Sequence, residues 1–219
     1  MKKQISIHFI GNSHTYYNDM PRMVAEIFES IGIDARVSMQ TEGGKDLLYH
    51  CARKDATFNI VYGKHDYVVL QEVASSFSPE DFAEGIAKFK QNSLDRSTAQ
   101  PILYMIWANQ GNRKYQSTII DAYRQGGEAL NAPIAPAGEV WMKLLRGNKD
   151  LPLYRDDGNH ATPLGSYLAA ACIFYAITGR ERPIKVEQGG EPQTRLGLDI
   201  EICKKIHSEA CRAAKKYKR

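Results

Sequence analysis

Short apolar runs alternate along this chain with longer segments in which apolar residues recur at helical spacing. The run from Tyr67 to Leu70 is continuous and bounded by charge, a pattern typical of a strand that is covered on both faces. We expect strands over residues 4–10, 35–39, 67–70, 101–107 and 132–135. Helices are expected over 19–32, 45–53, from residue 78 onward, 115–130, 139–145, 162–179 and 198–214.

Capping residues support the starts of three of these helices. Ser78 and Thr162 each stand directly before a proline, and Asp19 stands two residues before Pro21. Side chains of this kind satisfy the free N–H groups of a first helical turn, and proline is tolerated there. The stretch from Arg180 to Arg195 lacks such signals, so we expect one long loop in it.

Strands that alternate with helices predict a parallel sheet with helices packed on both faces. We therefore expect an α/β fold, a three-layer α/β/α sandwich with a central, mainly parallel five-stranded sheet. The 219 residues suit a single domain over residues 1–219. In open sheets of this kind, functional sites gather where strands end and helices begin. The pattern does not give the order of the strands.

The net charge of +4 is concentrated at one end, because four of the last five residues are basic. Such an end is typical of a solvated helix terminus, so we expect no nucleic-acid partner. The longest apolar run, Tyr167 to Ile177, is too short to span a bilayer. We therefore expect no membrane partner either.

The four cysteines form no CxxC pair and have no metal-ligand spacing, so we expect free thiols, no metal and no cofactor. Free thiols favour a reducing compartment. The residues after Lys3 are too polar for a secretory signal, which predicts a cytoplasmic protein. A leader removed beforehand leaves a secreted or periplasmic location open.

Ser13 follows the first expected strand in the turn Gly11-Asn12-Ser13. A serine hydroxyl becomes an effective nucleophile only when a base removes its proton. Near the start of a helix, backbone N–H groups around Ser13 would face a developing oxyanion. A plain turn or helix cap explains the same three residues, so this motif needs a partner elsewhere in the chain.

The segment Asp157-Gly158-Asn159-His160 supplies that partner. A carboxylate three residues before a histidine, on a turn, can accept the Nδ1–H of the imidazole. This interaction leaves Nε2 of His160 free to face a serine. Asp157 and His160 are therefore candidates for the acid and base of a catalytic triad with Ser13.

Two further residues stand at strand ends where an oxyanion could be bound. Gly44 follows the second strand and could offer a backbone N–H at close range. Gln71 ends the third strand, and its carboxamide could donate a hydrogen bond.

Phe9-Ile10-Gly11-Asn12-Ser13 resembles the first sequence block of the SGNH (GDSL-like) hydrolase superfamily, with Asn12 in place of the usual aspartate. The segment 157–160 resembles the last block, an Asp-x-x-His pair, and residues 162–170 resemble the helix that follows it there. The two blocks are about 150 residues apart and in the right order. The chain thus resembles a divergent SGNH hydrolase, which implies a flavodoxin-like fold.

By this resemblance Ser13 is the nucleophile, His160 the base and Asp157 its orienting partner. The oxyanion hole would combine the N–H groups of Ser13 and Gly44 with an asparagine side chain from a third block. That block, Gly-x-Asn-Asp, is absent here, and Gln71 is the first substitute. Asn109-Gln110 after the fourth strand compete with it. An ordinary α/β-hydrolase fits less well, because Thr15 stands where its Gly-x-Ser-x-Gly elbow needs glycine.

Several other polar and aromatic residues adjoin these motifs. His14 follows the nucleophile and is expected to face solvent, with substrate contact as the alternative. Tyr16, with Tyr17 and Trp107, could line a pocket and stack on a sugar ring, or could belong to the core. Asn109 is a further candidate for substrate binding.

The resemblance implies a serine ester hydrolase that acts on a small-molecule or glycan ester. The chain has no long apolar lid segment for a fatty chain, which favours short acyl groups, acetyl above all. Within enzymes, a thioesterase or lysophospholipase is the alternative. The missing third-block asparagine also leaves open a non-catalytic carbohydrate-binding or interaction protein that keeps the fold. The sequence does not determine the oligomeric state.

Overall fold

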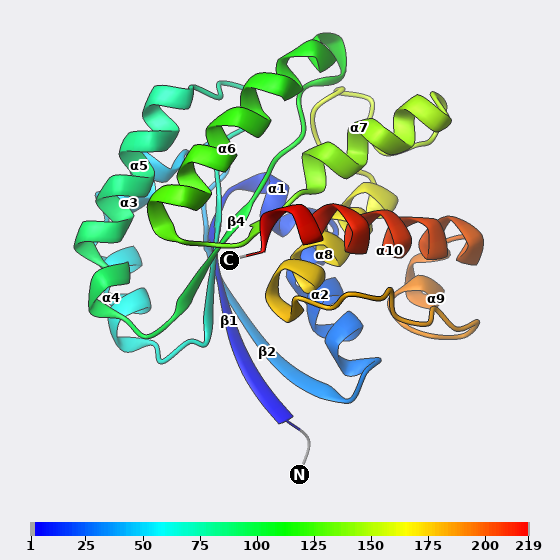
Figure 1. Ribbon diagram of the computed structural model, residues 1–219, viewed down its shortest axis with the longest axis horizontal. Coiled ribbons are helices and arrows are strands. Elements are labelled where there is room, and N and C mark those ends of the chain that lie inside the picture. The colour runs from blue at the N-terminus through cyan, green and yellow to red at the C-terminus, as the bar shows by residue number, and fades with distance from the viewer. Residues whose placement is uncertain (1–2, 219) are drawn as a thin grey trace.

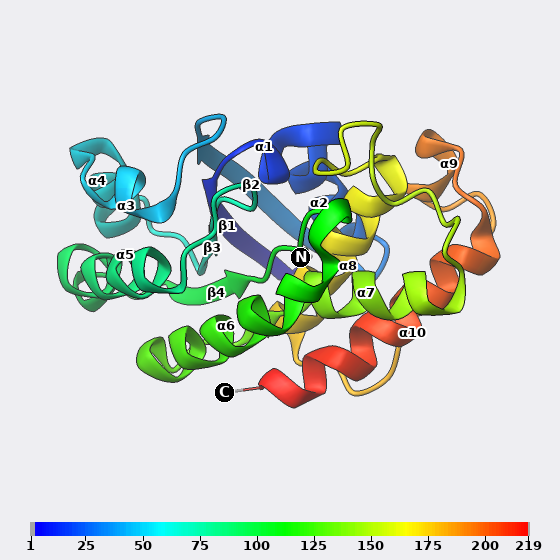
Figure 2. The same ribbon diagram turned by 90° about the horizontal axis from the view of Figure 1, so that it is seen from above.

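Five parallel strands form one sheet in the order β2-β1-β3-β4-β5 (Figures 1 and 2). They are β1 (Lys3–Gly11), β2 (Ile33–Thr41), β3 (Tyr67–Gln71), β4 (Gln100–Tyr104) and β5 (Ile134–Ala135). Each strand pairs in parallel with its neighbours. This computed structural model describes residues 3–218. The strand order is that of flavodoxin-like, doubly wound sheets, so the expected α/β/α fold is confirmed.

Helices cover both faces of the sheet, as Figure 2 shows. One layer consists of α2 (Met20–Glu29) and α8 (Pro163–Thr178), with α7 (Ala137–Gly147) and α10 (Ile200–Ala214) packed against α8. The other consists of α3 (Leu47–Cys51), α4 (Lys54–Tyr62), α5 (Pro79–Asn92) and α6 (Gln116–Leu130). Short helices complete the fold: α1 (Ser13–Tyr16), α9 (Gln193–Leu196), and the 3₁₀ turns η1 (Tyr17–Asp19), η2 (Leu94–Arg96), η3 (Gln110–Tyr115) and η4 (Lys215–Tyr217).

Burial follows the layers. Val68, Val69 and Leu70 of β3 are fully buried, as expected for a strand covered by helices on both faces. Helix α8 lies between the sheet and the outer helices, and residues 164–176 are all buried. Its apolar sequence therefore reflects a helix enclosed within the protein. No helix within residues 3–218 is long and apolar enough to cross a membrane.

Several elements differ from the sequence expectation. Strand β4 ends at Tyr104, because Met105 pairs instead with Ala135 and Gly138 at the start of α7. Helix α4 was not expected, since it buries only two residues and shows weak helical periodicity. The expected long loop is interrupted at its end, because α9 begins at Gln193. The side chain of Asp19 makes no capping hydrogen bond, whereas those of Ser78 and Thr162 do.

The carboxyl ends of three adjacent strands carry the loops of the candidate site. Strand β1 leads directly into α1, which begins at Ser13. Strand β2 leads into the loop with Gly44, and β3 leads into the loop that begins at Glu72. The loop between α7 and α8 holds His160 and lies above the same edge of the sheet (Figure 2). Parallel topology thus gathers segments that are far apart in the sequence.

Candidate active site

Ser13, His160 and Asp157 form a continuous chain of hydrogen bonds. The Oγ atom of Ser13 lies 2.8 Å from Nε2 of His160. The Nδ1 atom of the same ring lies 2.6 Å from Oδ2 of Asp157. This is the arrangement that nucleophile, base and orienting acid need for proton transfer. The structure therefore brings together the three residues that the sequence singled out.

Asn12 holds the turn that presents Ser13. Its Oδ1 atom accepts from the backbone N–H of His14 at 3.1 Å and so caps α1. Its Nδ2 group donates to the carbonyl of Lys45 at 2.9 Å, which ties the turn to the loop after β2. Asparagine at this position thus both caps the helix and fixes the loop that contains Gly44.

Gln71 lies beneath this turn and is fully buried. Its Oε1 atom accepts from the N–H of Asn12 at 2.9 Å and from the hydroxyl of Thr15 at 2.8 Å. Its Nε2 group donates to Oδ1 of Asn12 and to the carbonyl of Glu72. Both of its donor hydrogens are therefore engaged. The prediction that Gln71 donates to an oxyanion is wrong, and the side chain instead supports the turn that carries Ser13.

His160 lies on a tight hairpin between Tyr154 and Ala161, which form an isolated antiparallel bridge. The N–H of Arg155 donates to the carbonyl of His160 at 2.8 Å, and the N–H of Gly158 donates to the carbonyl of Arg155 at 2.9 Å. Gly158 has a φ of +65°, a conformation that glycine adopts without strain. The glycine between the acid and the base thus allows the turn that brings both side chains together.

Asp157 accepts two backbone hydrogen bonds in addition to that from the ring. Its Oδ1 atom accepts from the N–H groups of Asn159 and His160, each at 2.9 Å. Partial desolvation raises the pKa of Asp157, but these bonds and the imidazole outweigh it and lower the pKa to about 2. The carboxylate is therefore ionised near neutral pH and holds its hydrogen bond to the imidazole.

Asn18 fastens the nucleophile segment to the base segment. Its Nδ2 group donates to the carbonyl of Ala161 at 3.0 Å and to the hydroxyl of Ser166 at 2.8 Å. It has a φ of +56°, and asparagine is among the few side chains that tolerate this region. The sequence carries no local signal for Asn18, because only the contact between distant segments gives this residue a role.

A small pocket of about 270 Å³ opens beside the triad. Ser13 and His160 line it together with the following residues: Asn12, His14, Tyr16, Tyr17, Gly43, Gly44, Val73, Ser75 and Asn159. The candidates His14, Tyr16 and Gly44 thus belong to the pocket, and Ser75 was missed. Asn109 is not among the lining residues, and its side chain accepts from the N–H of Gly111 instead. Trp107 is fully buried and donates to the carbonyl of Asn159 at 2.8 Å.

His14 is buried at the base of this pocket, with 4% of its surface exposed, so the expectation that it faces solvent is wrong. Its ring packs against Trp107 and His160, with ring centroids 4.9 and 5.2 Å away. Burial, together with the neighbouring His160, lowers the pKa of His14 to about 4. His14 is therefore uncharged near neutral pH and adds no positive charge beside the candidate base.

Glu72 is a buried carboxyl group that braces two of the pocket loops. It accepts from the N–H of Val73 at 2.6 Å and from that of Leu47 at 3.2 Å. Desolvation raises the pKa of Glu72 to about 7 despite these two hydrogen bonds. The side chain joins the start of α3, just after Gly44, to the loop after β3.

The backbone N–H groups of Ser13 and Gly44, the candidate oxyanion donors, belong to residues that line the pocket. Neither group donates a hydrogen bond to another atom within residues 3–218. Gly44 has a φ of +71°, which a residue with a Cβ rarely adopts. Both residues line the pocket, on the side where the loop after β2 approaches α1.

Comparison with solved structures found clear similarities over most of the chain. A candidate SGNH hydrolase from Slackia heliotrinireducens is 25% identical, with a TM-score of 0.66 over 80% of this chain and 100% of that one. A DUF4886 family protein from Bacteroides uniformis is 20% identical, with a TM-score of 0.72 over 98% and 96%. Axe2, an acetylxylan esterase from Geobacillus stearothermophilus, is 14% identical, with a TM-score of 0.67 over 81% and 96%. No protein-family model matches the sequence, and no curated protein matches it either.

These similarities define the fold, which is that of the SGNH hydrolases. They support the resemblance of this chain to a divergent SGNH-like branch. Its structural neighbours include hydrolases, esterases and lipases, which supports a hydrolase at the level of the superfamily.

Proposed function

We propose that this protein is a serine ester hydrolase that removes short acyl groups, acetyl above all, from a carbohydrate or another small ester. Ser13 is the nucleophile, His160 the general base and Asp157 the residue that orients the imidazole. The hydrogen-bond chain that joins these three side chains carries the proposal. A binding protein that merely kept the fold would have no need for this alignment.

The reaction proceeds in two steps through a covalent intermediate. Ser13 Oγ attacks the ester carbonyl as Nε2 of His160 takes its proton, and the imidazolium then protonates the leaving alcohol. In the second step, the same imidazole activates a water molecule that releases the acid from Ser13. Asp157 remains ionised throughout and stabilises the imidazolium, consistent with its lowered pKa of about 2.

The oxyanion of each tetrahedral intermediate rests on the backbone N–H groups of Ser13 and Gly44. The SGNH superfamily adds an asparagine side chain from its third block, and Gln71 cannot replace it because its amide is engaged. Ser75 offers a hydroxyl from the loop after β3, the part of the chain that corresponds to that block. We therefore assign the third donor to Ser75 as part of the proposal.

The size and lining of the pocket support a short acyl group. The volume of about 270 Å³ lies below the range of roughly 300–1,000 Å³ that is usual for drug-sized ligands. Tyr16 and Tyr17 provide aromatic surface of the kind that packs against sugar rings. An acetylated sugar combines a small acyl group with such a ring.

A serine-directed fluorophosphonate tests the nucleophile directly. We expect one phosphonyl group on Ser13, found by mass spectrometry of peptides, and no labelling of the Ser13→Ala variant. Ser117→Ala is the control, because this serine is exposed on α6 and does not line the pocket at Ser13. It should still be labelled at Ser13. A folded wild-type protein that stays unlabelled would refute the proposal and favour a binding role.

Acyl preference is tested with p-nitrophenyl esters. We expect kcat/KM for acetyl to exceed that for decanoyl by about tenfold or more, because the pocket at Ser13, of about 270 Å³, is small for a ten-carbon acyl chain. A clear preference for decanoyl would contradict the acetyl assignment and favour a lysophospholipase or long-chain thioesterase. Acetylated xylo-oligosaccharides, followed by acetate release, test the carbohydrate part.

A further inference from the structure

A second hollow of about 590 Å³ lies between α6 and α7, outside the candidate active site. The two helices lie next to each other in Figure 1. Met142 and Leu145 of α7 form its buried floor, and Ile120 of α6 forms a partly buried wall. The volume falls within the range of roughly 300–1,000 Å³ that small-molecule sites occupy.

Basic side chains surround this apolar floor. The cations that line the hollow are Arg113, Lys114, Arg124, Arg146 and Lys149. Long basic side chains place methylene stems along an apolar wall and charged groups at its rim. The hollow therefore combines an apolar interior with a positively charged border.

Most of this positive charge is uncompensated by the protein. Within residues 3–218, no ion pair is formed by Lys114, Arg146 or Lys149, and Nε of Arg113 is buried without a hydrogen-bond partner. Among the described residues that line this hollow, Glu139 is the one carboxylate, and it is engaged by Lys216 and by the hydroxyl of Tyr217.

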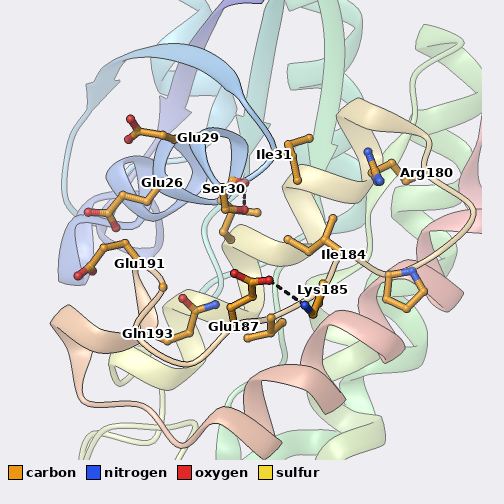
Figure 3. Close-up of a pocket in the computed structure, with 14 residues that line it drawn as sticks. Glu26, Glu29, Ser30, Ile31, Arg180, Ile184, Lys185, Glu187, Glu191 and Gln193 are labelled. Carbon is orange, nitrogen blue, oxygen red and sulfur yellow. Dashed lines mark hydrogen bonds and ion pairs between the residues drawn. The ribbon is translucent and has the colours of Figure 1, made fainter. Parts of the chain in front are cut away.

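The pocket shown in Figure 3 differs from the hollow between α6 and α7 in the charges that line it. It lies between the end of α2 and the loop after α8, and it holds several carboxylates together with basic groups. Two of its carboxylates form ion pairs: Glu187 with Lys185 of the same lining at 2.9 Å, and Glu26 with Arg195 outside it at 2.7 Å. Carboxylates outnumber cations in the lining of that pocket, whereas cations outnumber carboxylates in the hollow between α6 and α7.

We propose that the hollow between α6 and α7 binds an anionic amphiphile, a molecule with a single alkyl chain and a carboxylate head. The chain would lie on Met142, Leu145 and Ile120, and the head would meet the guanidinium of Arg113 and the cations at the rim. Guanidinium–carboxylate hydrogen bonds are charge-assisted and so favour an anionic head over a neutral one. A concave site of this volume suits one such molecule better than a flat bilayer surface.

The hollow continues into a smaller one of about 260 Å³, with Arg113, Leu145 and Lys149 shared between the two. This extension reaches Gln110, whose N–H donates to the carbonyl of Gly158 at 2.8 Å. An alkyl chain too long for the first hollow would therefore extend into the second one. The site is separate from the pocket at Ser13 and does not depend on the proposed ester hydrolysis.

Titration calorimetry with sodium decanoate tests the proposal on the full chain. We expect saturable binding of one decanoate per protein, and much weaker binding of decyltrimethylammonium and octyl glucoside, which present a cationic and a neutral head. The double variant Arg146→Glu/Lys149→Glu should weaken decanoate binding about tenfold or more. Lys54→Glu reverses a charge at the exposed start of α4 and should leave binding unchanged.

Two further variants separate this site from the rest of the molecule. Ile120→Asn should weaken binding through the wall of the hollow, with circular dichroism as the check of folding. Ser13→Ala should bind decanoate like the wild type, which distinguishes failure here from failure of the proposed hydrolysis. Equal binding of the three amphiphiles, or binding unchanged by the rim variant, would overturn the proposal. Binding of a polyglutamate peptide that is weakened in the rim variant, without any binding of decanoate, would also overturn the proposal.

Discussion

The Nε2 atom of His160 lies 2.8 Å from the hydroxyl oxygen of Ser13, although 147 positions separate the two residues in the sequence. The contact joins the turn after the first strand to a hairpin that precedes α8. Its geometry depends on the parts that hold each segment, namely Asn12 and Gln71 on one side and Asp157 on the other. Substitutions in and around these supports therefore have distinct expected effects on activity and stability.

Replacing Asp157 with asparagine should lower kcat by about 10³–10⁴-fold, because an amide can present the wrong tautomer of the imidazole to Ser13. Steady-state kinetics on p-nitrophenyl acetate measure this loss. The unfolding midpoint should change little, since the side chain of Asp157 is 47% exposed. Asp156→Asn is the control at the neighbouring exposed position and should retain wild-type rates. Near-normal activity of Asp157→Asn would exclude Asp157 as the orienting acid.

Replacing Asn18 with glycine should destabilise the protein by about 1–3 kcal/mol and lower kcat. Glycine accepts the positive φ but removes two hydrogen bonds, each worth about 0.5–1.5 kcal/mol. Urea unfolding and esterase kinetics give the two readouts. Asn131→Gly is the matched control, because Asn131 also has a positive φ of 50° but is exposed at the end of α6. If both variants behave alike, Asn18 does not link the two segments of the site.

Glu72 should make stability fall as pH rises from about 4.5 to about 7. Its pKa is raised from 4.5 to about 7 in the folded protein by burial, so the unfolded chain releases this proton first. The stabilising contribution is complete below pH 4.5 and lost above about pH 7. The difference in unfolding free energy between the wild type and Glu72→Gln should therefore change across this window. Glu80→Gln, an exposed position in the first turn of α5, should show no such change.

Replacing Gly11 with alanine should destabilise the protein by about 1–3 kcal/mol and reduce activity. A Cβ there would lie 2.5 Å from Oε1 of Gln71 and 2.7 Å from the hydroxyl of Thr15. These are the atoms that support the Ser13 turn from below. Gly111→Ala is the control, since its added carbon meets nothing closer than 3.6 Å. A Gly11→Ala variant with normal stability and kinetics would show that the support can rearrange freely.

The order of the main elements was predictable because each has a local physical signature. Val68, Val69 and Leu70 form an apolar run that only a covered strand or buried helix can accommodate, and charge at both ends limits its length. Thr162 and Pro163 mark the start of α8 through a side-chain cap and a fixed φ. The sequence does not predict α4, because this helix buries only two residues and so shows no clear apolar periodicity.

The candidate triad was predictable for a similar reason, since its acid and base lie on one short turn and its serine directly follows a strand. The role of Gln71 was not predictable. A carboxamide at a strand end can donate into a pocket or support the backbone, and only its four hydrogen bonds decide between the two. His14 was misjudged in the same way, because Trp107 and His160 enclose it from distant parts of the chain.

The sequence by itself determined the alternation of strands and helices, the turn with Ser13 and the segment from Asp157 to His160. These features rest on periodicity, capping and turn chemistry, which act between residues close together in the chain. Only the tertiary structure decided which polar groups are already paired within the protein, because pairing depends on which distant segments meet. That is why the engaged amide of Gln71, the link through Asn18 and the unpaired charge between α6 and α7 emerged from the folded molecule alone.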